Sequence, residues 1–257
     1  MKKKRNPDGA IREDIRGALN RAWPDGVIEM TFDSEDSYFW DAYPKLAAAL
    51  RRIKGAHLSH EIEAEAEPAW FDDSDSGEDP PDDQEPSRSY HIFFVCPDGE
   101  EFTYETEIES LAEPGGQYEG EDEGEWPMEA VRGTGTTGWC VAVSLLAPFA
   151  VITLSDREVF EDGSASEPSI ESRGFTEAGQ RIDPEAEFLK FKGEQAFEKL
   201  LKLRGRIVDI LGRYGIGVLP EEECRKPVSW LRADSGVLVG IAGDPIRVLD
   251  ALFFEGL

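Results

Sequence analysis

The sequence predicts an α+β protein with a mostly antiparallel β-sheet, a central apolar hairpin and several packed helices. The first observation is a run at residues 133–155 without any charged side chain, although 32% of the 257 residues are charged. The second is an alternation of side chains at residues 56–67 and 101–109, with the period of two that is typical of half-buried strands. The third is a long pattern of helical spacing at residues 183–214, which predicts a long helix in the C-terminal half.

In the N-terminal part, the sequence predicts a helix, a short strand and a second helix. Asp8 is expected to cap the first helix, whose apolar face would carry Ile11, Ile15, Leu19 and Ala22. A turn at Pro24-Asp25-Gly26 leads to a strand at residues 27–32, and the second helix is expected at about residues 37–54. The aromatic residues near its start are interpreted as core rather than as a ligand cage: Tyr38, Phe39, Trp40 and Tyr43.

The middle of the chain predicts strands separated by two acidic loops. Residues 90–96 are apolar on both faces, and Pro97-Asp98-Gly99 is interpreted as a hairpin turn that joins them to the alternating segment 101–109. Two stretches rich in acids, Pro, Ser or Gly, at about residues 70–88 and 113–126, are predicted to be disordered. Because no clear boundary interrupts the pattern, residues 1–257 are expected to form a single domain.

The C-terminal half contains the apolar hairpin and the long helix. The hairpin is expected to turn near Ala147-Pro148, and Asp162-Gly163 is expected to end its second strand. Asp183-Pro184 combines an N-cap residue with Pro at the first helical position, which is a strong helix start. Gly193 and Gly205 interrupt the helical pattern, so two shorter helices are an alternative to one.

The formal net charge of −27 is concentrated in the middle third of the chain. Residues 57–131 contain 25 carboxylates and a single basic residue, Arg88. Such a field repels nucleic acid phosphates and anionic lipid, and it favours a basic protein, a cation or simple solubility. We therefore expect a basic protein partner, no direct binding of nucleic acid and no membrane association. Pro148, in the middle of the uncharged run, also argues against a membrane span.

The cysteines and the N-terminal residues indicate a cytoplasmic protein. Cys96, Cys140 and Cys224 are far apart and lie beside apolar residues, so buried free thiols in a reducing compartment are expected. The basic N-terminus lacks the apolar segment of a signal peptide. Lys2 to Arg5 resemble a nuclear signal, but a disordered basic tail is the preferred interpretation.

The glycines of the uncharged run match a dinucleotide-binding pattern in spacing alone. Gly133, Gly135 and Gly138 spell G-x-G-x-x-G, which requires a strand before it and a helix after it. Here an acidic loop precedes the pattern and a β-rich run follows it. A phosphate-binding loop is excluded because Trp139 and Cys140 stand where Lys and Ser or Thr are needed. We interpret the glycines as a flexible turn that leads into the hairpin.

No catalytic residue, cofactor or metal site is predicted. Residues 72–83 fit a calcium loop in part, but Asp79 stands where an apolar residue is needed and no flanking helix is expected. His57 and His60 would point to opposite faces of a strand unless the chain bends between them. Cys140 lies in the most apolar run, where the pKa of a thiol is raised and the thiol is inert. Among so many carboxylates, no pair stands out for acid–base catalysis.

Two rows of carboxylates form the predicted partner-binding site. One row follows the alternating segment 56–67 and the other follows residues 101–109. Like charges on neighbouring strands are destabilising, so the rows must be solvated, spaced apart, covered by the chain's own basic groups or presented to a basic partner. Basic residues of the long helix are the internal candidates: Lys190, Lys192, Lys199, Lys202, Arg204 and Arg206. The predicted site residues are Glu61, Glu63, Glu65, Glu67, Glu101, Glu105, Glu107 and Glu109.

These observations favour a non-enzymatic, bacterial-type binding protein whose acidic surface engages a basic protein. An immunity protein or antitoxin that neutralises a nuclease-like toxin, or an inhibitor that mimics nucleic acid, would fit. One alternative is an enzyme with an unrecognised, carboxylate-rich and metal-dependent site. Another is a structural or regulatory subunit of a larger assembly, which would dock through Trp230, Phe253 and Phe254.

Overall fold

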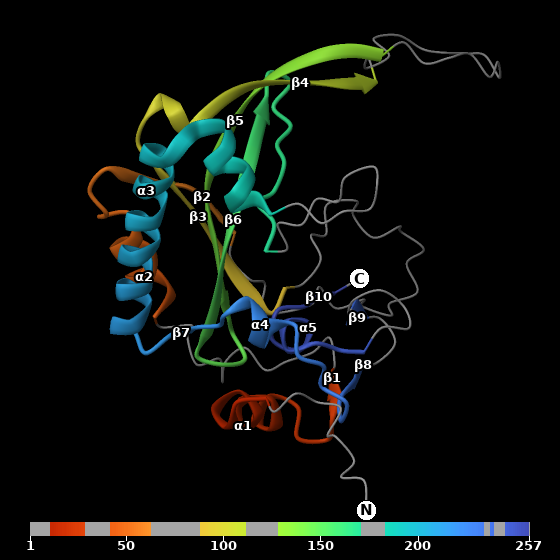
Figure 1. Cartoon of the computed structure of the whole chain (residues 1–257). Helices are drawn as coiled ribbons and strands as arrows, with labels where there is room; N and C mark the ends of the chain where they lie inside the picture. The colour runs from red at the N-terminus through yellow and green to blue at the C-terminus, as the bar shows by residue number, and fades with distance from the viewer. Residues whose placement is uncertain are drawn as a thin grey trace, which may run out of the picture.

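The structure, a computed structural model, describes residues 11–28, 42–62, 88–111, 128–170, 183–233, 237–238 and 245–256. It contains both helices and strands, which confirms the α+β class (Figure 1). In chain order the elements are α1 (Glu13–Ala22), β1 (Val27–Ile28), α2 (Tyr43–Leu50), β2 (Ala56–Ile62), β3 (Tyr90–Pro97), the 3₁₀ turn η1 (Glu100–Phe102), β4 (Thr103–Leu111), β5 (Met128–Ser144), β6 (Phe149–Phe160), α3 (Pro184–Arg213), β7 (Gly217–Val218), α4 (Glu221–Cys224), β8 (Arg232–Ala233), β9 (Val237–Leu238), α5 (Val248–Leu252) and β10 (Glu255–Gly256).

The main sheet has the strand order β2-β3-β5-β6-β7, and β4 also pairs with β5. β7 runs parallel to β6, whereas the other pairings in this sheet are antiparallel. The sheet is therefore mixed, which corrects the expectation of a mostly antiparallel sheet. The reason is α3, which carries the chain from the end of β6 back to its start, so that β7 runs in the same direction as β6.

The predicted central hairpin is present as β5 and β6. These strands pair from Val143 opposite Ala150 to Gly133 opposite Phe160, with the turn at residues 145–148. In the sheet, β5 lies between β6 on one side and β3 and β4 on the other. Trp139 at the middle of β5 is fully buried, and its indole N–H donates to the carbonyl of Leu200 in α3 at 2.9 Å. The hairpin is therefore the scaffold on which the helices pack.

Helices cover both faces of the lower sheet (Figure 1). Phe93 and Val95 of β3 pack in one core with α2 and α3, whereas Phe94 and Cys96 pack in a second core with α1, α5 and the C-terminal residues. Neighbouring residues of a strand point to opposite faces, so both faces of β3 are buried. This explains why residues 90–96 form a continuous apolar run instead of an alternating one.

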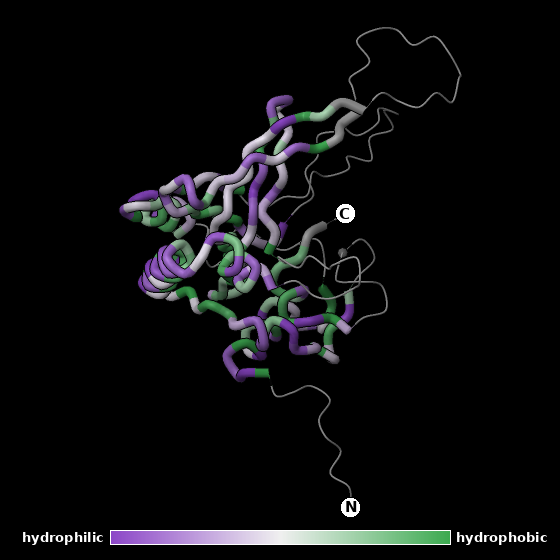
Figure 2. The backbone as a smooth tube through the Cα atoms, turned by 45° about the horizontal axis from the view of Figure 1, so that its top comes forward, coloured by the Kyte–Doolittle hydropathy of each residue, from purple (hydrophilic) through white to green (hydrophobic). Residues whose placement is uncertain are grey.

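β3 and β4 do not form the predicted hairpin. β3 pairs with residues 139–144 of β5, and β4 pairs with residues 128–136 of the same strand. Between them the chain turns at Gly99 and through η1, whose Phe102 is fully buried and anchors the turn. β4 thus continues along the same side of β5, and the two strands project beyond the helices as an arm (Figure 1). In Figure 2, hydrophilic residues along this arm alternate with less polar ones.

The glycines at 133–138 lie within β5 and not in a flexible turn, which corrects that interpretation. A methyl group at Gly135 would overlap the ring of Tyr104 on β4, and one at Gly133 would lie 2.6 Å from the ring of Phe160 on β6. These positions need glycine because aromatic rings from both neighbouring strands lie against the backbone of β5.

The long helix is present and is bent at one of the two predicted glycines. The Asp183 carboxylate accepts hydrogen bonds from the backbone N–H groups of Glu185 and Ala186, as its N-cap position predicts. Gly193 has φ 82° and ψ 172°, a conformation outside the helical region, and it divides α3. Gly205 lies inside the second, regular part of α3.

Several predicted features lie outside the described residues. They include the strand at 29–32, the start of the second helix before residue 42, most of the stretch 70–88 and all of 113–126. The Asp8 cap also falls there, and α1 has Arg12 as its N-cap instead. In the described part of the chain, no helix is long and apolar enough to cross a membrane.

Candidate functional site

A β-bulge breaks the acidic row expected on β2. The pairing with β3 shifts between Leu58 and His60, so one extra residue is inserted. Glu61 therefore faces α2, on the same side of the sheet as Leu58, and not on the predicted outer face. The Tyr43 hydroxyl donates to Glu61 Oε1 at 2.8 Å, and Arg51 donates to Oε2 at 2.5 Å. The protein's own side chains thus bind this carboxylate.

On the other predicted row, Glu101 is also covered by the protein itself. Lys199 of α3 forms a hydrogen-bonded ion pair with it, and this contact lowers the pKa of the Glu101 carboxyl. The predicted cover by basic residues of the long helix is therefore present at this position. Elsewhere on the helix, Arg206 donates to the carbonyl of Lys54, and the guanidinium of Arg204 lies 5.8 Å from the centre of the Trp139 ring.

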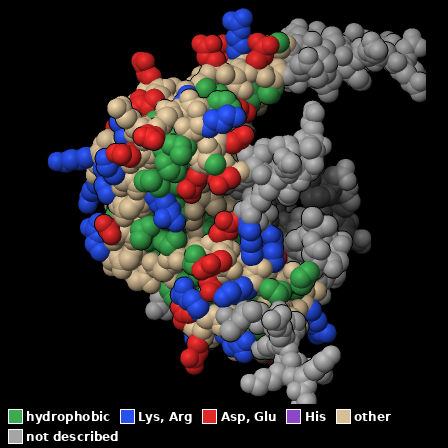
Figure 3. Space-filling model, in the orientation of Figure 1, with side chains coloured by type: hydrophobic (Ala, Val, Ile, Leu, Met, Phe, Trp, Pro, Cys, Tyr) green, Lys and Arg blue, Asp and Glu red, His purple; other side chains and the backbone are tan. Residues whose placement is uncertain are grey.

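Glu105 and Glu107 are exposed on one face of the arm. Glu107 Oε2 lies 3.9 Å from Arg132 Nε on β5, and both of these side chains are largely in water. A surface ion pair of this kind contributes about 0–1 kcal/mol, so the face remains open to other cations. Figure 3 shows acidic and basic side chains next to each other over the arm.

The structure thus separates the two predicted rows. β2 pairs with β3 and β4 pairs with β5, so Glu61 and the β4 carboxylates lie on strands that are not neighbours. Glu109 lies on β4 opposite Ala130, and its side chain is outside the described residues. Glu63, Glu65 and Glu67 are also outside them. Of the predicted set, the exposed carboxylates on described side chains are Glu105 and Glu107.

Arg88, the only basic residue of the acidic middle third, does not neutralise this surface. Its side chain is buried, with 8% of the residue exposed, and its guanidinium donates to Glu167 Oε2 at 2.6 Å. In the described part of the chain, the acidic rows are contacted by cations from outside this third: Arg51, Arg132 and Lys199.

A pocket on the opposite face of the arm was missed by the sequence reasoning. It has a volume of 250 Å³ and lies between the sheet and the first part of α3. Its lining includes Tyr104 of β4, Thr137 of β5, Asp156 of β6 and Phe191 of α3. Asp156 lies opposite Thr137 in the strand register, and the Thr137 hydroxyl donates to its Oδ1 at 2.5 Å.

The pocket is acidic. Its surroundings displace water from Asp156 and raise the pKa of this carboxyl; the Thr137 hydrogen bond opposes the shift, and the negative charge of Glu158 adds to it. Burial also raises the pKa of Tyr104, whose hydroxyl donates to Glu158 Oε1 at 3.2 Å. Lys192 is the basic residue of the lining, and its Nζ lies 3.2 Å from the carbonyl oxygen of Thr103. A positively charged group would stabilise the ionised form of Asp156.

One pattern in the sequence marks this pocket. Asp156 and Glu158 follow an apolar strand at alternating positions, so both point to the same face of β6. In the register of β5 they lie opposite Thr137 and Gly135. The Tyr104 ring fills the space over Gly135, whereas the small side chain of Thr137 leaves room beside Asp156; the strand pairing must be known before this can be seen.

The bend that would bring two histidines to one face is present. The bulge in β2 places His57 and His60 on the same face, opposite Cys96 and Phe94. His57 Nδ1 lies 3.0 Å from Asp98 Oδ1 at the surface. Across the described ranges, no group of three or more His, Cys, Asp and Glu side chains is placed to hold a metal ion. The partial calcium loop at 72–83 lies outside those ranges.

The cysteines and the C-terminal aromatic residues belong to the core. Cys96, Cys140 and Cys224 are buried free thiols, as expected, and burial raises the pKa of Cys140 to about 12. Phe253 and Phe254 are buried as well. The surface that the subunit alternative would need from these two rings is therefore not available in this fold.

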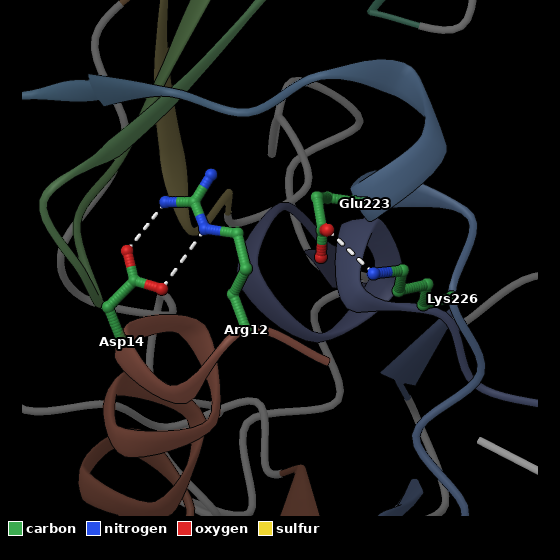
Figure 4. Close-up of polar contacts among 4 residues, drawn as sticks. All are labelled: Arg12, Asp14, Glu223 and Lys226. Atoms are coloured by element: carbon green, nitrogen blue, oxygen red, sulfur yellow. Dashed lines mark hydrogen bonds and ion pairs between the residues drawn. The ribbon is translucent and has the colours of Figure 1, made fainter. Parts of the chain in front are cut away.

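Two further ion pairs lie near the start of α1 and at α4 (Figure 4). The Arg12 guanidinium donates to both carboxylate oxygens of Asp14, at 3.1 and 2.5 Å. Lys226 Nζ lies 2.6 Å from Glu223 Oε1, and Glu223 is buried. The negative charge of Glu223 also helps to raise the pKa of Arg12, after the larger effect of Asp14. Both ion pairs are local to their own segments, and the pocket that Arg12 and Asp14 line is separate from the arm.

No family model, curated protein or solved structure matches the chain. The function of the arm is therefore inferred from its own residues.

Proposed function

We propose that the protein is a non-enzymatic, cytoplasmic binding protein that engages a basic protein through the exposed acidic face of the β4–β5 arm. An inhibitor of the immunity or antitoxin type, directed at a basic, nuclease-like partner, fits this surface. Negative charge on an exposed surface accelerates association with a positive partner, and salt weakens this effect.

The observation that carries the proposal is the contrast between paired and exposed carboxylates. Glu61 forms an ion pair with Arg51, and Glu101 forms one with Lys199, so their negative charge is largely compensated within the protein. Glu105 and Glu107 are exposed on β4 of the arm. Glu107 lies 3.9 Å from Arg132, but both side chains are exposed, so a partner that contacts the arm would meet negative charge that the protein neutralises only in part.

Affinity capture with purified protein tests the proposal. The immobilised chain should retain a basic protein from a lysate of the source organism at low salt and release it at high salt. After identification by mass spectrometry, that protein should bind the wild type in calorimetry. It should bind Glu105→Gln/Glu107→Gln roughly tenfold more weakly, because two exposed charges are lost.

The matched control is the double variant Glu61→Gln/Glu101→Gln. It removes the same amount of charge, but from carboxylates that are already paired, Glu61 on β2 and Glu101 in η1. Its affinity for the partner should stay close to that of the wild type. Equal losses in both double variants would show that only net charge matters, and binding that ignores salt would contradict the proposal.

A further inference from the structure

The pocket between the arm and α3 is too small for a typical small-molecule ligand. Its 250 Å³ is below the range of about 300–1,000 Å³ that such ligands occupy. One long side chain of another protein is a better match for this volume. The chemistry of the walls then decides which side chain it would be.

One wall of the pocket is apolar and comes from α3. Phe188 is buried there and stacks with Phe102, with ring centres 6.0 Å apart. Phe191, one turn further, is 71% exposed, which is unusual for a large apolar side chain on a helix that packs against a sheet. The Lys190 ammonium lies 5.1 Å from the centre of this ring, so the ring already contacts a cation of its own helix, and its exposed surface can cover the methylene groups of a second side chain.

The kink in α3 accounts for this exposure. Phe191 lies two residues before Gly193, where the helix departs from its regular geometry. The part of α3 after Gly193 packs closely on the sheet, since Leu200, Leu203 and Ile207 are fully buried. The bend thus leaves the first part of the helix with an aromatic ring at the rim of the pocket.

The remaining walls supply negative charge. Asp156 lies on the sheet side, and Glu187 contributes a second carboxylate from the first turn of α3. Lys192 is also in the lining; its Nζ is bonded to the carbonyl of Thr103, and its positive charge already acts on Asp156, so the two carboxylates exceed the lining's one cation by a single charge. A second copy of this chain, with a net charge of −27, would meet strong repulsion here. A cationic group with an apolar stem is complementary to both kinds of wall.

We infer that this pocket receives one arginine or lysine side chain of the basic partner, with its stem against Phe188 and Phe191 and its cation at Asp156. The inference rests on the proposed function and adds an anchor point to it. The exposed carboxylates of Glu105 and Glu107 attract the partner, and the pocket on the other face of the arm holds one of its side chains. The partner would therefore grip the arm from both faces.

The test uses two short peptides, acetyl-Gly-Arg-Gly-amide and the same peptide with citrulline in place of arginine. Citrulline has nearly the same shape but no charge. Titrated into isotope-labelled protein, the arginine peptide should shift the NMR signals of Phe191 and Asp156 in a saturable manner, whereas the citrulline peptide should not. Asp156→Asn, which keeps an acceptor for Thr137, should weaken arginine-peptide binding roughly tenfold.

Two further variants separate the pocket from general charge effects. Phe191→Ala should weaken the arginine peptide as well, because the apolar wall is lost, and its thermal unfolding reports whether the fold is intact. Asp25→Asn removes one charge from the exposed turn after α1, outside both proposed sites, and should leave peptide binding unchanged. Equal binding of the two peptides, or an Asp156→Asn variant that binds as well as the wild type, would overturn the inference.

This experiment can fail independently of the proposed function. Suppose that the pocket variants keep full affinity for a captured basic partner while Glu105→Gln/Glu107→Gln loses it. The proposed function of the acidic arm would then be supported, and the inference about the pocket would be refuted. If the arginine peptide binds as described but no basic protein is captured, the pocket stands and the proposed function fails.

Discussion

At the scale of single residues, burial shifts the pKa values of two titratable side chains, His91 and Asp156. His91 is almost fully buried, its ring lies 4.0 Å from that of Tyr43, and burial lowers its pKa to about 4. Asp156 shows the opposite effect of lost hydration, since the pKa of its carboxyl is raised. Burial disfavours the charged form of each side chain, so it moves the two pKa values in opposite directions.

The position of His91 predicts a loss of stability in mild acid. The unfolded chain takes up a proton at this side chain below about pH 6.5, whereas the folded protein does so only near pH 4. The free energy of unfolding should therefore fall by up to roughly 3 kcal/mol between these values. His91→Phe keeps an aromatic ring beside Tyr43 and should lose less stability over this range in urea unfolding.

A second pH range provides the control for that measurement. Above about pH 7.5, His91 is neutral in the folded and the unfolded chain, so the difference in stability between the wild type and His91→Phe should stay constant there. If His91→Phe and the wild type lost equal stability between pH 6.5 and pH 4, the buried histidine would not be the group responsible.

At the scale of elements, close packing of side chains against the backbone of β5 determines how the strands of the arm fit together. The glycines of this strand give room to Tyr104 and Phe160 from the neighbouring strands, and the bulge in β2 turns Glu61 toward α2. The kink at Gly193 changes the direction of α3 between its first part and its second part. The spaces at the glycines and the bulge do not follow from the period of apolar residues, because each depends on what lies on the adjacent strand, whereas a break at Gly193 was one of the alternatives that the sequence offered.

Two glycine-to-alanine changes should have opposite effects on stability. Gly135→Ala places a methyl group where the Tyr104 ring lies, so the free energy of unfolding should fall by roughly 1–3 kcal/mol. Gly205→Ala adds a methyl group on α3 with no atom within 4 Å, and better helix propensity should raise the free energy of unfolding by about 1 kcal/mol. Urea unfolding of both variants measures the two effects.

A double variant shows whether the Tyr104 ring is the cause. In Tyr104→Ala, the added methyl group of Gly135→Ala meets no ring, so the second change should be much less harmful than in the wild type. Purely additive losses would indicate that Gly135 is needed for some other reason.

At the scale of the whole molecule, negative charge opposes the compact state. The net charge of −27 arises mainly from residues 57–131, and Arg88, the one basic residue in that range, is buried against Glu167. Repulsion between like charges destabilises a folded chain, and dissolved salt screens it. The same screening weakens attraction to a basic partner, so salt should act in opposite directions on the free protein and on the complex.

Sodium chloride should therefore raise the urea midpoint of the free protein while it lowers affinity for a captured basic partner. The variant Glu105→Gln/Glu107→Gln carries less charge, and its midpoint should depend less on salt than that of the wild type. A midpoint that falls with added salt would mean that ion pairs such as Lys199–Glu101 outweigh the repulsion.

The sequence by itself determined the α+β class, the central hairpin, the capped long helix and the uneven charge. These features follow from local pattern: the periods of apolar residues, the Asp183-Pro184 start and residue counts depend only on neighbours along the chain. An N-cap side chain bonds backbone N–H groups only two or three residues further along the chain, so the sequence alone identified Asp183 as the cap. Uninterrupted apolar runs likewise mark strands that are covered on both faces.

Only the tertiary structure decided which carboxylates are covered and which are exposed. Glu61 and Glu105 both lie in segments where acidic and less polar residues alternate. In the structure, a bulge in β2 turns Glu61 toward α2, where it pairs with Arg51, whereas Glu105 is exposed on the arm. Whether a cation lies beside a carboxylate depends on elements far apart in the chain, as Lys199 and Glu101 are. The pocket at Asp156 arises for the same reason, since β4, β6 and the kinked start of α3 meet there only in the folded protein.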